Sequence, residues 1–135
     1  MLEPLVAGEL GDGTQLDATT HPPLVRHVEF VLDLPTDEDL IESFPVFLVS
    51  ESLGHALASA NLTGFWFDDA DVRPSTEYLA AYGAVSHKRY RWLRPQCRPH
   101  SSDCWLDERH RLCVSDRMYA VLSQPDRRLR RDDCR

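Results

Sequence analysis

Cysteines and histidines gather in one stretch of the chain, where they could bind a metal. The pattern is Cys97-Arg-Pro-His100, then Cys104, then His110-Arg-Leu-Cys113. A tetrahedral zinc site needs four nitrogen or sulfur ligands, which a Cys-x2-His and a His-x2-Cys pair would supply. The nine residues between His100 and His110 are a shorter spacer than ribbon-type sites use. Cys104 and Cys113 also adjoin apolar residues, as cysteines that pack as small hydrophobes do. We therefore predict no cofactor and keep a zinc-stapled binding module as the alternative.

Nucleophilic catalysis would require a thiol, Cys97 or Cys104, with a histidine beside it as its base, namely His87, His100 or His110. No local motif supports this chemistry: the sequence has no Gly-x-Ser-x-Gly, no His-Glu-x-x-His and no glycine loop for phosphate. Asp68 and Asp69 are adjacent, so in an extended segment they point in opposite directions and cannot share acid–base work. We predict that the protein is not an enzyme.

The segment from Arg89 to Arg94 interleaves basic and aromatic residues, a pattern that can bind single-stranded nucleic acid by stacking and phosphate contact. A strand over 87–93, however, places Tyr90 and Trp92 on one buried face and leaves the arginines in solvent. An isoelectric point of about 5.2 also opposes nucleic-acid binding. The sequence therefore predicts no nucleic-acid partner.

A short unit that occurs twice, 65 positions apart, predicts the elements around these residues. The copies read FLVSESLGHAL (47–57) and LCVSDRMYAVL (112–122). Each predicts a buried strand that ends at a serine N-cap (Ser50, Ser115) and continues into an amphipathic helix with an acid in its first turn. The unit predicts secondary structure and contains no catalytic or ligand-binding motif. We therefore expect the protein to act through its surface.

The remaining pattern predicts an α+β fold in one domain over 1–122, with a mixed or antiparallel sheet and a few short helices. Residues 1–21 are expected to be an irregular lead-in, and 123–135 a flexible charged tail. The predicted strands cover 24–34, 46–49, a segment from 65 toward 72 and 87–93, and a short segment around 105–106 leads into the second unit. One predicted helix begins near 37 and ends before Pro45. Another follows Ser75, covers 76–82 and ends at Gly83.

The N-terminus lacks the basic flank and apolar core of a secretory signal, and no run approaches the ~20 apolar residues of a membrane helix. We therefore expect a cytoplasmic protein with no membrane partner, whose four cysteines are reduced thiols.

Charge divides unevenly along the chain. Residues 1–72 hold fourteen acids and one basic residue, a net charge of −13, whereas residues 73–135 have a net charge of +6. The two halves either interleave in the fold and cancel, or leave an acidic face built from 33–42 and 68–71. Such a face would attract a basic partner, for example a nuclease, and speed its association.

Several of these segments together resemble bacterial immunity proteins of polymorphic toxin systems. They are FLVSESL followed by NLTGFWF (47–67), YRWLRP (90–95), DCWLD (103–107) and the second copy of the unit (112–122). The resemblance covers about 45–122, and it implies an α+β fold without catalytic residues that neutralises a cognate toxin by direct binding. The second unit departs from the family pattern because no Leu-Thr-Gly strand follows it.

We therefore expect an immunity protein that covers its toxin with a surface of about 800 Å². Trp66 is the expected anchor, because alternation places it opposite Phe65 and Phe67 and because binding hot spots favour Trp. The predicted partner-binding residues are Asp37, Glu38, Asp39, Glu42, Trp66, Asp68, Asp69 and Asp71.

Overall fold

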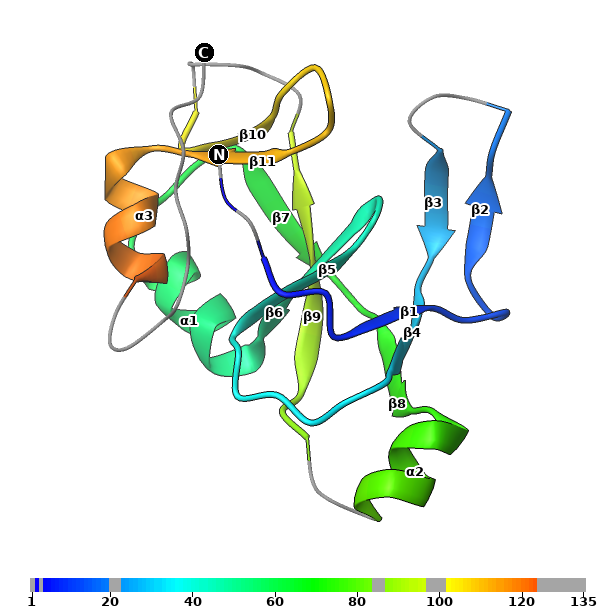
Figure 1. Cartoon of the computed structure of the whole chain (residues 1–135). Coiled ribbons are helices and arrows are strands. Elements are labelled where there is room, and N and C mark those ends of the chain that lie inside the picture. Colours follow the sequence, from blue (N-terminus) through cyan, green and yellow to red (C-terminus); the bar gives the residue numbers. More distant parts are fainter. Residues whose placement is uncertain (1, 3, 20–22, 84–86, 97–101, 124–135) are drawn as a thin grey trace.

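The computed structural model, which describes residues 2, 4–19, 23–83, 87–96 and 102–123, is built around a four-stranded antiparallel sheet (Figure 1). The strand order is β5 (Leu40–Ser43), β6 (Val46–Ser50), β9 (Tyr90–Pro95) and β7 (Phe65–Asp68). Every residue of β6 is buried, as the apolar run in its sequence predicts for a strand that is covered on both faces. The α+β prediction is confirmed.

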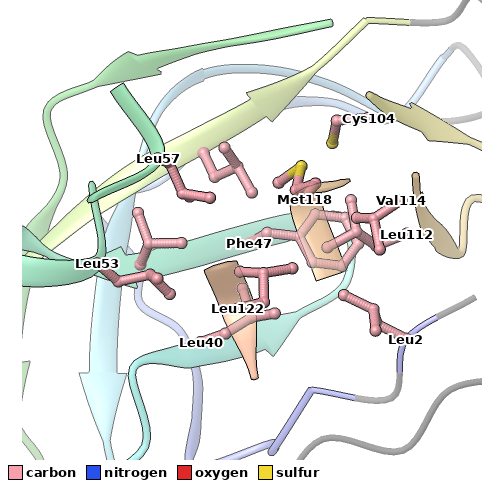
Figure 2. Close-up of a cluster of buried hydrophobic side chains, with 12 residues drawn as sticks. Leu2, Leu40, Phe47, Leu53, Leu57, Cys104, Leu112, Val114, Met118 and Leu122 are labelled. Carbon is pink, nitrogen blue, oxygen red and sulfur yellow. The ribbon is translucent and has the colours of Figure 1, made fainter. Parts of the chain in front are cut away.

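Two helices and a hairpin cover one face of this sheet. They are α1 (Glu51–Ser59), α3 (Asp116–Leu122) and the hairpin of β10 (Cys104–Leu106) with β11 (Leu112–Val114). Figure 2 shows how Leu53 and Leu57 of α1 and Met118 and Leu122 of α3 meet around Phe47 of β6. The two repeated units therefore share one hydrophobic core.

The opposite face packs on a three-stranded sheet of β1 (Gly8–Leu10), β4 (Glu29–Leu32) and β8 (Asp71–Pro74). A second core lies between the sheets and contains Phe30, Leu48 and Trp92. The hairpin of β2 (Gln15–Asp17) and β3 (Leu24–His27) extends from this layer, and α2 (Thr76–Tyr82) follows β8.

Both predicted serine caps are confirmed, and each is held by an aspartate that precedes the unit. The Ser50 hydroxyl accepts the Leu53 amide at 3.2 Å and donates to the Asp39 carboxylate at 2.6 Å. In the second unit, Ser115 and Asp103 repeat this arrangement, with a hydroxyl–carboxylate distance of 2.7 Å. The structural repeat is thus a hairpin and a helix joined by an Asp–Ser pair, which is longer than the repeat in the sequence.

The predicted helix that ends before Pro45 is wrong, because Leu40–Ser43 is a strand paired with β6. Leu40 and Ile41 are adjacent and both buried, since each faces a different core. Together with Phe44 they imitate a helical spacing, but Phe44 is 53% exposed in the turn. The prediction that Leu40, Ile41 and Phe44 form one inward face therefore fails at Phe44.

Two of the predicted strands are divided in the structure. The segment 24–34 forms β3 and β4, which belong to different sheets. The segment from 65 toward 72 forms β7 and β8, which likewise belong to different sheets. In both cases the chain passes from one sheet to another, and the alternation of apolar and polar residues does not indicate where this happens. The predicted helix over 76–82 is confirmed, with Ser75 as its cap and Gly83 after its last residue. The predicted irregular lead-in over 1–21 is wrong where β1 and β2 form, because these residues pair with β4 and β3. The predicted tail lies outside the described residues, except for Ser123.

Gly64 is expected to tolerate no side chain. It has a φ of +95°, and an added Cβ would clash with the backbone oxygen of Cys104 and the side chain of Ser102. We expect Gly64→Ala to lower the free energy of unfolding by about 3 kcal/mol, measured by urea denaturation. Gly83 also has a positive φ, but nothing lies within 4 Å of its added Cβ. With a φ of +71° and a ψ of −155°, Gly83→Ala should cost the backbone strain alone, about 1–2 kcal/mol, and equal costs would contradict the clash.

Candidate functional site

The first predicted acidic segment is partly structural. The side chain of Asp39 is only 13% exposed, and besides the Ser50 hydroxyl it contacts the Lys88 ammonium at 3.0 Å. The backbone oxygen of Glu38 accepts the Tyr90 hydroxyl at 2.8 Å, and Asp37 is exposed. Glu42 lies farther along β5, opposite Phe47, where partial burial raises the pKa of its carboxyl. Of these four acids, Asp37 and Glu38 present the carboxylates best placed to meet a partner.

The second acidic segment joins β7 to β8 and is interleaved with basic residues. Asp68 contacts Arg94 at 3.0 Å, Asp69 contacts Arg91 at 3.8 Å, and Asp71 contacts His27 at 3.0 Å. The amide of Asp69 and the Arg94 guanidinium lower the pKa of the Asp68 carboxyl. The three carboxylates remain half-exposed or more, and that of Asp69 is fully exposed. At these positions the charges of the two halves interleave, as one of the two sequence interpretations supposes.

Trp66 is 45% exposed and lies on β7, an edge strand of the four-stranded sheet. Its cross-strand neighbour is Arg94, whose guanidinium lies 5.1 Å from the Trp66 ring centroid and 4.2 Å from that of Trp92. Phe65 and Phe67 point to the other face, into the first core. The guanidinium between two indoles, tied to Asp68 on its outer side, holds Trp66 in a defined orientation.

The two acidic segments lie at the same end of the four-stranded sheet, because the antiparallel register places Asp39, Ser50, Tyr90 and Asp68 toward one end. An open groove of about 690 Å³ adjoins the second acidic segment and is bounded by α1, the β7–β8 connection and the start of β9. Its polar lining mixes both charge signs, and comprises Glu51, His55, Asp69, Asp71, His87, Arg89 and Arg91. The groove is suited to a charged protein segment.

The candidate metal ligands are only partly described. Cys97 and His100 lie outside the described residues, and among the rest of the structure no group of three or more His, Cys, Asp or Glu side chains could hold a metal ion. Cys104 is a buried free thiol, and burial raises its pKa. Cys113 is buried and disulfide-bonded, so the prediction of four reduced thiols is wrong for this residue.

Sequence reasoning missed the roles of Asp39 and Asp103. The signal was present, because each aspartate precedes its capping serine by nearly the same interval in the two units. Extending the comparison of the two units toward the N-terminus would have shown these aspartates.

Sequence reasoning also missed Arg94 as the support of Trp66, because their pairing depends on a strand register that the sequence does not specify.

We expect the protein to lose stability in acid through the Asp103 and Asp107 carboxyls. Burial alone would raise both pKa values, but hydrogen bonds from Ser115 and Thr63 to Asp103, and from Arg111 and Arg109 to Asp107, lower them below the ordinary value of 3.8. The folded state then binds these protons less readily than the unfolded state. Their stabilisation is present above the ordinary pKa and is lost as the pH falls through the lowered one.

The measurement for this acid effect is urea denaturation between about pH 5 and pH 2.5, where carboxyls titrate. Asp103→Asn removes one of the two groups, so its free energy of unfolding should fall less steeply over this range. If the free energy of unfolding falls with pH as steeply in the variant as in the wild type, Asp103 does not contribute to the loss of stability in acid.

No helix in the described part of the chain is long and apolar enough to cross a membrane. Comparison with family models, with curated proteins and with solved structures finds no match to this chain.

Proposed function

We propose that this protein is an immunity protein that neutralises a cognate bacterial toxin by direct binding, without catalysis. The observation that carries the proposal is the surface around β7, where exposed Trp66 is oriented by Arg94 beside the carboxylates of Asp68, Asp69 and Asp71. We name these five residues the β7 surface. A large aromatic side chain next to an arginine is typical of binding hot spots. The resemblance of the 45–122 segments to immunity proteins supports the same function.

The charge of the β7 surface favours a basic partner. The three aspartates have basic neighbours, yet surface ion pairs of this kind contribute little and leave the carboxylates hydrated. The net charge of −7 for the whole chain adds a long-range attraction for a cationic protein. A basic nuclease domain is one toxin class that fits this charge.

The test is to purify this protein with the product of the adjacent gene, with the catalytic residues of that product disabled, and to measure a complex and its association rate. We expect a stable complex whose association rate falls as salt is raised. Asp69→Asn with Asp71→Asn should slow association on the order of tenfold. The matched control is Asp12→Asn with Glu77→Gln, which removes two exposed charges elsewhere. Absence of a complex, together with no protection of cells that express the toxin, would refute the function.

The proposal places the protein in the cytoplasm, where its toxin would act. The disulfide at Cys113 counts against this location, because disulfides are typical of oxidising compartments. Lysis of the cells directly into a denaturant that contains an alkylating reagent, followed by mass spectrometry, decides the point. A cytoplasmic protein should carry the label at Cys113 after unfolding, whereas an unlabelled Cys113 would place it outside the cytoplasm.

A further inference from the structure

The two edges of the four-stranded sheet differ in how their backbone groups are satisfied. At the β5 edge, the N-terminal segment pairs with the strand: the Glu42 amide donates to the Leu5 carbonyl at 3.0 Å, and Leu5 forms a parallel bridge with Ile41. At the other edge, β7 has β9 as its only paired strand among the described residues. This edge therefore offers an unpaired strand to another chain.

The register identifies which groups of β7 face outward. The Gln96 amide donates to the Gly64 carbonyl at 2.7 Å, so this pair is hydrogen-bonded, and in an antiparallel ladder such pairs alternate. Trp66 therefore bonds to Arg94 of β9, whereas the backbone N–H and C=O groups of Phe65 and Phe67 point away from β9. These groups have no backbone partner in the described part of the structure.

We propose that an extended segment of the partner protein adds to β7 as a fifth strand, through main-chain hydrogen bonds to Phe65 and Phe67. This inference rests on the proposed function and specifies how the partner binds. Such strand addition obtains affinity from the backbone and specificity from alternate side chains. On one face the added strand would contact Trp66, and beyond Asp68 it would pass the fully exposed Asp69 at the mouth of the groove.

Charge identifies the occupant as a different protein and not a second copy of this chain. The end of β7 presents Asp68 and Asp69, and so favours a segment with lysine or arginine at the matching positions. A second copy would bring its own Phe65–Asp68, which contains no basic residue, together with a second pair of these aspartates. Pairing of two β7 strands would therefore add no cation beyond Arg91 and Arg94, which already contact Asp69 and Asp68, whereas a basic segment would add one.

Hydrogen exchange of assigned backbone amides tests this geometry, with the disabled adjacent-gene product as the probe. In the free protein the Phe65 and Phe67 amides should exchange rapidly, while the Trp66 amide, which bonds to Arg94, is protected. In the complex we expect exchange at Phe65 and Phe67 to slow at least tenfold, since exchange then requires opening of the added strand. Little further change is expected at Trp66, which is the internal control.

The outcomes separate this inference from the proposed function. A stable complex in which Phe65 and Phe67 exchange as fast as in the free protein would overturn strand addition and leave the immunity function standing. Protection that appears without partner and rises with the concentration of this protein would assign the edge to a second copy, and would overturn the inference as well. Absence of any complex would refute the proposed function and strand addition together.

Discussion

Replacement of Asp103 by alanine is expected to lower the free energy of unfolding by about 3 kcal/mol. The residue is 8% exposed, and its carboxylate accepts the Ser115 hydroxyl at 2.7 Å and the Thr63 amide at 2.9 Å. It thereby ties the start of α3 to the segment that precedes β7. Alanine would leave the partly buried Thr63 amide and the capping Ser115 hydroxyl without their charged acceptor, and the loss of these hydrogen bonds accounts for most of the expected cost.

Urea denaturation measures this loss, and two further variants locate its cause. Asp103→Asn keeps the shape and one acceptor oxygen, so it should cost less than alanine does. Asp39→Ala breaks the equivalent contact with Ser50 and also frees Lys88, so we expect a loss of about 2–3 kcal/mol there. If Asp103→Ala costs less than about 1 kcal/mol, α3 is held by its apolar contacts and not by the Asp–Ser pair.

The helix starts could be predicted from sequence because their causes are local. A serine followed by an acid and by apolar residues at helical spacing is sufficient to set Ser50, Ser75 and Ser115 as caps, and all three accept the expected amide. The buried strand β6 could also be predicted from sequence, because a run of apolar residues suits a strand that lies between two hydrophobic cores. These elements need no knowledge of distant residues.

The misread parts depend on distant partners. Leu40–Ser43 becomes a strand because β6 lies beside it, although its apolar spacing also suits a helix. For Asp39 the sequence indicated only a negative charge, and it did not indicate that Ser50 and Lys88, from other parts of the chain, contact its carboxylate. An aspartate that faces solvent and an aspartate that holds a helix cap are the same residue type in the sequence. Only the register of the strands distinguishes Asp39 from Asp69.

Trp66→Ala is expected to weaken binding of the cognate toxin at least 30-fold, about 2 kcal/mol. The ring is half exposed in the free protein, so it can be buried on binding, and its position on Arg94 limits the conformational entropy lost on association. Calorimetric titration of the wild-type and variant proteins with the disabled toxin gives the ratio of dissociation constants. The variant should remain folded, because it loses one exposed cation–π contact worth about 1 kcal/mol or less.

Tyr82 supplies the matched control, because it is also aromatic and 50% exposed but lies at the end of α2, outside the β7 surface. Tyr82→Ala should therefore leave the dissociation constant within about threefold of the wild-type value, as substitutions outside hot spots do. Equal losses in the two variants would show that exposed aromatics act non-specifically. An unchanged affinity in Trp66→Ala, with the complex intact, would place the interface away from β7, because a buried tryptophan anchor cannot be removed without cost.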